Sequence, residues 1–407
     1  MLTEERVRTA LQAPPDRLWR LPLERALSRI DVHALRAAGT AFVVSRLLLL
    51  AVGYLSVALR IGIAGYPAVG WRVPWKAWYQ WDAHWFVRIA EHGYQWQNAH
   101  QFSSVAFFPV FPMMIALLHG VAPVPFPLAG MLVANGSFAI ALYALHRLAR
   151  REWGEVVATR TVLYLSLFPV SLFFFAGYSE APYLLWSVLC LAALRRRRWA
   201  WAALWGFLAT GTRSMGLALL APFAIELWQA YGTRRANRCW VWMIAVPGGI
   251  ACYALYLGAR FGNPLLFDRA QRAWHRTTTW PWRGVIATLR DISPAHLAAY
   301  RTAHNLACIL ALAGFAALIV VGRHRLPLSF SIYAGIALLM TLVNPAILDG
   351  YYLPLRSMPR FCLVLFPCFI TLALAGEHPF VDRLMLSLGP AGLAILAIVF
   401  QQGGWVA

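Results

Sequence analysis

The chain has 407 residues, of which 60% are hydrophobic and only 13% are charged, against roughly 25% charged residues in ordinary soluble domains. The mean hydropathy is +0.58. This composition excludes a soluble globular protein, a disordered chain and a disulfide-stapled secreted module. It indicates a polytopic membrane protein.

The formal net charge of +20 comes mainly from arginines that stand at the ends of apolar runs. Arg195 to Arg198 form the densest cluster, and further arginines stand at 234, 235, 238, 323 and 325. Such clusters are typical of cytoplasmic loops beside anionic lipid. The charge therefore favours membrane lipids, and not nucleic acid, as the partner of these arginines.

The N-terminal segment and the cysteines give two further expectations. Residues 1–38 carry mixed charge before the first apolar run, so they form no cleavable signal and are predicted to be a cytoplasmic lead-in. Residues 39–407 are predicted to form a single transmembrane domain. The six cysteines lie in or beside apolar runs without CxxC or metal-ligand spacing, which predicts packing roles.

Twelve apolar segments are candidates for transmembrane or re-entrant helices, although several fall short of the roughly 20 residues of a full crossing. We expect an all-α membrane protein with about 10–12 such helices. The segments are 39–60, 107–121, 127–147, 157–176, 180–194, 199–211, 214–229, 239–260, 302–322, 326–343, 360–376 and 384–401.

The arginines also predict the topology. They place residues before 38 and the loops at 146–160, 195–198, 231–238, 323–325 and 377–383 in the cytoplasm. The first outer loop is then 61–106, and the second long outer loop is 261–301. Three full crossings before residue 146 would put the basic segment 146–160 outside. We therefore expect the proline-rich stretch 107–127 to enter the membrane and return on the same side.

One stretch of the first outer loop combines acidic, basic and aromatic residues. From Trp81 to Tyr94 the sequence predicts a short amphipathic helix at the membrane interface, with Gly93 as its stop. The tryptophans around it suit a belt at the level of the lipid headgroups. They stand at 71, 75, 78, 81, 85 and 96.

Asp82 stands at the expected start of this helix. A carboxylate at the mouth of a membrane cavity could accept a proton from a sugar hydroxyl, but Asp is also a preferred N-cap, and capping alone would explain it. Glu91 could likewise simply pair with Arg88. A metal site at His84, His92 and His100 is not favoured, because no ligand spacing such as HExxH supports it.

Several motifs in chain order resemble the PIG-V-type mannosyltransferases, which add the second mannose in glycosylphosphatidylinositol assembly and have bacterial relatives. The family's arginine element usually reads Arg-Ser-Asn-Gly, so Met215 departs from it. The resemblance runs from about residue 42 to residue 370. The motifs are Trp81-Asp82, Ile89 to Tyr94, Phe107 to Pro112, Leu167-Phe168-Pro169 with Phe173-Phe174, Tyr178 to Ala181, Thr212 to Gly216, Gly262-Asn263-Pro264 with Ala270-Gln271 and Trp274, and Met358 to Phe361.

The resemblance implies a GT-C glycosyltransferase fold with a catalytic aspartate in the first non-cytoplasmic loop, and Asp82 matches that aspartate. It implies a polyprenyl-phosphate-mannose donor and a lipid-linked or glycan acceptor. For a bacterial member it also implies the inner (plasma) membrane, with the active site facing the periplasm or exterior. No cofactor is expected.

The implied reaction inverts the anomeric carbon while the lipid phosphate leaves from the opposite face. A base takes the proton of the acceptor hydroxyl, and cations stabilise the phosphate. Arg213 and Arg360, each at a turn between apolar runs on the outer side, suit that role. Each could instead mark a helix end, and Arg213 could pair with Glu180.

The expected sugar-binding residues lie on the same side of the membrane. They are Trp81, His84, Glu91, His92, Tyr178, Glu180 and Gln271. Tyr178 and Glu180 could equally belong to a mere tight turn. Asp268 and Gln271 share the loop 261–301 with Trp274, Trp280 and Trp282, and for these aromatics an interfacial belt is the first interpretation.

Two rival functions remain at this point. A lipid or sugar transporter would place charges near the middle of the membrane and favour inverted repeats, whereas the polar clusters here gather in loops on one side. A transferase of another polyprenyl-phosphate sugar would share the same residues.

Overall fold

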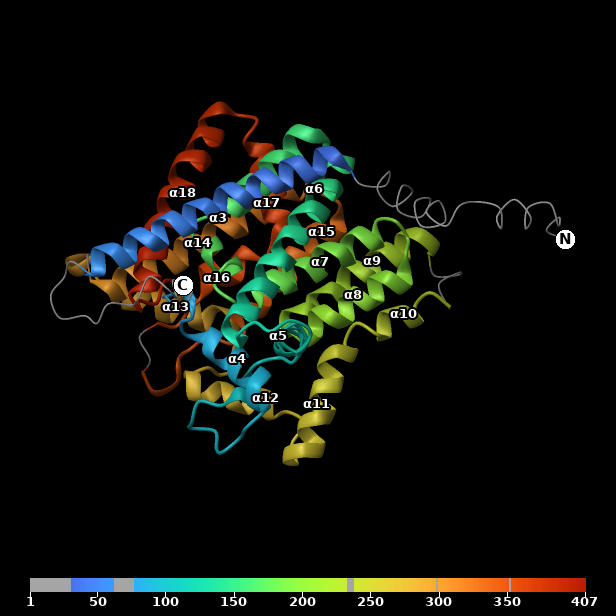
Figure 1. Ribbon diagram of the computed structural model, residues 1–407. Helices are drawn as coiled ribbons and strands as arrows, with labels where there is room; N and C mark the ends of the chain where they lie inside the picture. The colour runs from blue at the N-terminus through green and yellow to red at the C-terminus, as the bar shows by residue number, and fades with distance from the viewer. Residues whose placement is uncertain (1–30, 62–76, 233–237, 298, 351–352) are drawn as a thin grey trace, which may run out of the picture.

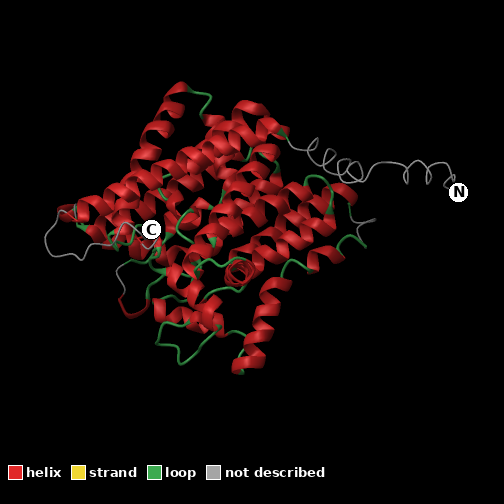
Figure 2. Ribbon diagram, in the orientation of Figure 1, coloured by secondary structure: helices red, strands yellow, loops and turns green. Residues whose placement is uncertain are grey.

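The structure is a computed structural model that describes residues 31–61, 77–232, 238–297, 299–350 and 353–407. In these residues all regular structure is helical, apart from an isolated bridge between Arg276 and Ala346 (Figure 2). The expected all-α fold is confirmed. Most of the predicted lead-in, together with Trp71 and Trp75, lies outside the described residues.

The helices keep the labels of Figure 1. They are α3 (Val32–Ile61), α4 (Asp82–His92), α5 (Val110–Val121), α6 (Phe126–Leu167), α7 (Glu180–Leu194), α8 (Trp199–Thr212), α9 (Leu220–Tyr231), α10 (Val241–Ile244), α11 (Gly248–Phe261), α12 (Leu266–Arg269), α13 (Pro281–Asp291), α14 (Tyr300–Gly322), α15 (Leu328–Leu342), α16 (Met358–Leu363), α17 (Phe366–Ala375) and α18 (Pro379–Gln401).

Four of the described helices, α3, α6, α14 and α18, are long and apolar enough to cross a membrane. The other apolar helices are shorter than the roughly 20 residues that a crossing needs. Three predicted spans, 214–229, 239–260 and 360–376, are each divided into two helical elements. Pro247 and Pro367 stand at two of these breaks, because proline cannot continue the hydrogen bonding of a preceding helix.

The chain turns within the predicted loop 146–160, but most of that loop is helical. The 42-residue element α6 consists of two helices that meet at Gly154, whose backbone has φ 85° and ψ 176°, and His146 Nε2 lies 3.4 Å from Thr159 Oγ1 across this bend. Only glycine adopts such a conformation at little cost. The helix also ends at Leu167, nine residues before the end of the predicted span 157–176, because Pro169 follows.

One large buried apolar cluster runs through the helices from α3 to α18. Helix α3 packs against α6 and α18, and α7 packs between α6 and α8. Helices α4, α5, α11 and α12 lie together on one side of this body, at the bottom of Figure 1. That side carries the cavity described next. The division into a lead-in and one transmembrane domain stays a prediction.

Candidate active site

A cavity of about 330 Å³ opens among elements that are far apart in the sequence. Its walls come from α4, the ends of α8 and α15, the α12 region, α16 and the segment after α18. The polar and charged residues that line it are Asp82, Ser179, Thr212, Arg213, Ser214, Asp268, Gln271, Arg276, Thr341, Asn344, Arg356, Ser357 and Arg360. Phenylalanines and tryptophans form most of the remaining wall. This volume lies within the range of small-ligand sites.

Helix α4 presents Asp82 to the cavity because its apolar face is buried. Ala83, Phe86, Val87 and Ile89 pack inward, as the amphipathic pattern predicts. The helix ends at Gly93, whose N–H donates to the Ile89 carbonyl, so the predicted stop is confirmed.

The N-cap of α4 is Trp81, and Asp82 is the first helical residue. The Asp82 side chain makes no capping hydrogen bond, so the capping interpretation is wrong. Its Oδ2 instead accepts a hydrogen bond from Arg360 Nη1 at 2.6 Å. Among the described residues, Asp82 Oδ1 has no hydrogen-bond partner, and the carboxylate lines the cavity.

Asp82 is one end of a chain of alternating charges. Arg360 binds Asp82 through Nη1 and Glu180 Oε1 through Nε. The same Glu180 oxygen accepts a hydrogen bond from Arg213 Nη1, which also donates to Ser179 Oγ at 3.1 Å. The sequence alternative that Arg213 pairs with Glu180 is therefore confirmed, and Arg213 lines the cavity as well.

The centre of this chain is removed from solvent. Glu180 is fully buried, and Arg360 is 4% exposed. The Arg360 guanidinium lies 4.6 Å from the ring centroid of Tyr178 and 5.1 Å from that of Phe173. Ionic groups lose much hydration free energy on burial. A chain of ion pairs beneath a cavity is thus weak as a stabilising device, and it suggests a function in the site.

A glycine explains how Arg213 reaches this position. After α8 the chain turns back in a short 3-10 helix, Ser214–Leu219. A Cβ on Gly216 would lie 2.6 Å from Thr210 N and 2.7 Å from the Ala209 carbonyl carbon. Only glycine fits this close approach of two backbone segments, which holds Arg213 at the junction.

The structure divides the predicted site residues into three groups. Asp82, Gln271, Arg213 and Arg360 line the cavity. Glu180 and Tyr178 lie beneath it, and the Tyr178 hydroxyl donates to the Gln80 carbonyl at 3.0 Å. The other four are exposed and are not part of the cavity lining: Trp81, His84, Glu91 and His92.

The exposed residues of α4 have local partners. The His84 ring lies against Tyr79 with centroids 4.0 Å apart and the planes tilted by 53°, and partial burial there lowers the pKa of His84, although a backbone hydrogen bond at Tyr79 acts in the opposite direction. Glu91 contacts His92 at 3.7 Å, while Arg88 donates to Gln95. The predicted Arg88–Glu91 pair is therefore wrong. Substrate binding by these residues remains a prediction.

Sequence reasoning missed several residues of the cavity wall. Arg276 and Arg356 add two guanidinium groups, and Trp405 brings an indole from the segment after α18. The Tyr300 hydroxyl holds that segment by donating to the Trp405 carbonyl at 3.0 Å. Arg276 follows Trp274 by two residues, and Arg356 precedes Met358 by two. Their position beside these two motifs was the signal that could have identified them.

In the part of the chain that the structure describes, no three His, Cys, Asp or Glu side chains are grouped as metal ligands. Two of the acidic groups at the cavity are bound by arginines instead. Asp82 and Glu180 are engaged in this way.

Comparison with known proteins gives matches over part of the chain. Residues 70–238 match the family model described as "Mannosyltransferase (PIG-V)". The human GPI alpha-1,6-mannosyltransferase 2 is 37% identical over 151 residues, which cover 34% of this chain and 29% of that protein. The mouse protein is 36% identical over 155 residues, covering 35% and 30%. The chain thus matches less than a third of the length of these relatives.

Among solved structures, the apo oligosaccharyltransferase of Archaeoglobus fulgidus gives a TM-score of 0.43 at 11% identity, covering 89% of this chain and 56% of that one. Its complex with an inhibitory peptide and a dolichol-phosphate gives 0.45 at 11% identity over the same shares.

Proposed function

We propose that this protein is an integral membrane mannosyltransferase of the PIG-V type with a GT-C fold. It transfers mannose from a polyprenyl-phosphate-mannose donor to a lipid-linked or glycan acceptor. One observation carries the proposal: Asp82, a carboxylate inside the segment 70–238 that matches the family model, lines the cavity and is held there by the buried Arg360.

Asp82 is the proposed base. Its Oδ2 is fixed by Arg360, while Oδ1 faces no described donor and can accept the proton of the acceptor hydroxyl. The hydroxyl oxygen bonds to the anomeric carbon as the bond between that carbon and the phosphate oxygen breaks. The electron pair of the broken bond leaves with the lipid phosphate. The proton ends on Asp82, so charge and atoms balance.

Arg213 and Arg360 are the proposed cations near the departing phosphate. Arg213 supports this assignment best, because it lines the cavity and binds Glu180 through only one of its guanidinium nitrogens, Nη1. Arg360 uses Nε and Nη1 for the two carboxylates, so its main part is to hold Asp82 in place. Positive groups fixed before reaction stabilise developing charge without reorganisation.

For the sugar, Gln271 is the best-supported residue, since it lines the cavity beside Trp274. Tyr178 and Glu180 act from beneath, by supporting Arg360. Trp81, His84, Glu91 and His92 are proposed contacts of the acceptor or of the donor outside the cavity.

The cavity is proposed to open on the non-cytoplasmic side of the membrane. The first outer loop 61–106 and the second outer loop 261–301 both contribute to the cavity, through Asp82 and Gln271. The arginine clusters favour the opposite side as cytoplasmic. In a bacterial plasma membrane the cavity would then open to the periplasm or exterior.

The test is transfer of labelled mannose from polyprenyl-phosphate-mannose by purified protein in lipid nanodiscs. Wild-type protein should release polyprenyl phosphate in proportion to mannose transferred, and Asp82→Asn should not. Asp349→Asn is a matched control, because Asp349 is an exposed carboxylate that does not line the cavity. Movement of intact donor across the bilayer without release of polyprenyl phosphate would identify a transporter. Transfer of a different sugar would correct the substrate.

A further inference from the structure

The charges of the cavity do not balance locally. Arg213 and Arg360 are neutralised by Glu180 and Asp82. Arg276, on the same cavity wall, forms no ion pair with any described carboxylate. Its guanidinium donates only to two backbone carbonyls, those of Asn344 at 3.2 Å and Arg356 at 3.3 Å. Among the described residues, Arg276 is therefore a cavity cation without an ion-pair partner, and the carboxylates of Asp82 and Asp268 line the same cavity without binding it.

Backbone contacts fix the position of Arg276. It forms the isolated bridge with Ala346, and its N–H donates to the Gln271 carbonyl at 3.1 Å. The next residue, Thr277, donates to the Pro345 carbonyl at 3.2 Å. The side chain thus extends from a segment paired with its neighbour and not from a free loop.

An aromatic ring links Arg276 to Arg213. The Arg276 guanidinium carbon lies 5.3 Å from the ring centroid of Phe361, and that of Arg213 lies 5.5 Å from the same ring. Phe361 itself lines the cavity. Both guanidinium groups therefore lie near the ring of Phe361 at the cavity wall.

The surroundings disfavour the charge of Arg276. Burial, together with the positive charges of Arg356, Arg360 and Arg213, lowers the pKa of this guanidinium to about 10, while Asp82 opposes them. The group remains protonated at neutral pH. A bound anion would favour the charged form of Arg276 and so offset both the cost of its burial and the repulsion by the neighbouring arginines.

We propose that Arg276 is the principal ligand of the phosphate group of the lipid substrate, with Arg213 beside it. The inference deepens the proposed function and rests on it. A guanidinium can give a phosphate two parallel hydrogen bonds, and Arg276 has N–H groups beyond those bound to the two carbonyls.

The transfer step changes the charge of the phosphate that Arg276 is proposed to bind. The donor is a phosphodiester with one negative charge. After transfer the lipid carries a phosphate monoester, whose charge at pH 7 is about −1.5 to −2. The negative charge therefore grows where Arg276 lies, so Arg276 stabilises the departing group more than the bound donor.

The experiment measures binding of polyprenyl phosphate, of polyprenol and of inorganic phosphate to the full chain in nanodiscs, without acceptor. The variants are Arg276→Gln and Arg276→Lys. Arg272→Gln is the matched control, since Arg272 is an exposed arginine four residues earlier and does not line the cavity. Thermal unfolding of each variant without ligand reports on folding.

We expect Arg276→Gln to weaken polyprenyl phosphate binding about ten- to hundredfold, as for the loss of a charged hydrogen bond. Arg276→Lys should lose less, and Arg272→Gln should bind within twofold of wild type. Polyprenol binding should not change. Wild type should bind polyprenyl phosphate more tightly than polyprenyl-phosphate-mannose, and Arg276→Gln should bring that ratio toward one.

The inference is overturned if Arg276→Gln binds polyprenyl phosphate as wild type does, or if it loses polyprenol equally, since the phosphate would then not be the group recognised. Inorganic phosphate binding as tightly as the lipid phosphate would overturn the lipid assignment. If wild type binds inorganic phosphate through Arg276 but no polyprenyl phosphate, the proposed function fails while the anion site stands.

Discussion

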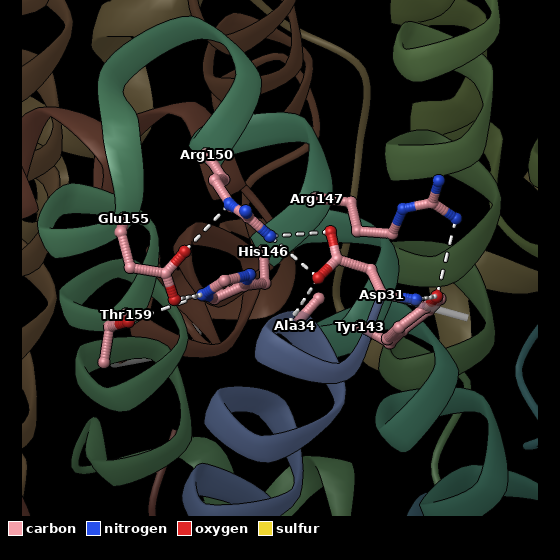
Figure 3. Close-up of polar contacts among 8 residues, drawn as sticks. All are labelled: Asp31, Ala34, Tyr143, His146, Arg147, Arg150, Glu155 and Thr159. Atoms are coloured by element: carbon pink, nitrogen blue, oxygen red, sulfur yellow. Dashed lines mark hydrogen bonds and ion pairs between the residues drawn. The ribbon is translucent and has the colours of Figure 1, made fainter. Parts of the chain in front are cut away.

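Two ion-pair networks of similar composition lie in different environments. Around the cavity, Asp82, Arg360, Glu180 and Arg213 form one chain. At the bend of α6, Arg150 binds Asp31 at 2.7 Å and Glu155 at 2.9 Å (Figure 3). The Arg150 side chain is 37% exposed and that of Glu155 is 45% exposed, whereas Arg360 is 5% and Glu180 is 0% exposed.

The second network joins chain segments and does not line the cavity of Asp82. His146 contacts Glu155 at 3.3 Å, so both sides of the Gly154 bend are connected (Figure 3). Asp31 Oδ1 also accepts a hydrogen bond from the Ala34 N–H and so caps the start of α3. His146 is buried, but the two Arg150 pairs are partly solvated, and such pairs contribute about 0–1 kcal/mol each.

The difference shows which network serves function. A structural link can be solvated, as at the bend of α6. Burying Arg360 and Glu180 at a cavity costs hydration free energy, and a merely structural link would not need it. Changes in the cavity network should therefore act on substrate, and changes at the bend on stability.

The largest expected effect is at Asp82. Asp82→Asn should reduce mannose transfer by about 10²–10⁴-fold, as for loss of a general base, with little change in expression or donor binding. Initial rates at saturating donor measure this. Glu91→Gln should be milder, because Glu91 is exposed and outside the cavity lining. An Asp82→Asn rate within a few-fold of wild type would refute the assignment of the base.

The next effect is at Arg213, where the two interpretations of the site diverge. Arg213→Ala should weaken polyprenyl phosphate binding by at least tenfold, and Arg213→Lys should do so less, because it keeps the charge but loses the forked geometry. Binding and thermal unfolding are measured on the same samples. A lower melting temperature with unchanged affinity would make Arg213 a purely structural partner of Glu180.

We expect the cavity and the arginine cluster 195–198 to lie on opposite sides of the membrane. A cysteine at Gln101, which is exposed in the first outer loop 61–106, should react in intact cells with a membrane-impermeant thiol reagent. One at Arg196, in the exposed arginine cluster, should react only after permeabilisation. Cys252, the exposed native cysteine, is first replaced by serine. Reversed labelling would place the cavity in the cytoplasm.

The sequence predicted the bounds of a helix well where residues next to those bounds mark them. The bounds of α7 agree with the predicted segment 180–194, because an apolar run there is followed at once by arginines. The α4 helix and its stop at Gly93 followed from apolar spacing and a glycine. The bend in α6 falls within the predicted loop 146–160, but the sequence did not show that a single glycine makes it between two helices.

For the site, the sequence predicted individual residues but not the contacts between them. The sequence named Asp82 and Arg360, but the ion pair between them joins positions 278 residues apart. No local period encodes such a contact, which depends on how the whole helical body packs. Arg276 and Trp405 were missed for the same reason: only the folded chain shows that they line the cavity of Asp82.

The smallest expected effect is at the bend of α6. Arg150→Gln removes the partner of Asp31 and Glu155, and should lower the free energy of unfolding by about 1 kcal/mol while transfer stays within twofold of wild type. Burial acts to raise the pKa of Asp31, but the Ala34 N–H and the Arg150 charge lower it below its ordinary value. A carboxyl with a lowered folded-state pKa stabilises the fold above its unfolded pKa of about 3.9, and this contribution is lost as the pH falls through the folded-state pKa. The difference in melting temperature between wild type and Arg150→Gln should therefore be full at pH 7 and shrink below about pH 4. A loss of transfer as large as that of Arg213→Ala would show that the two networks are coupled and that the bend also serves the cavity.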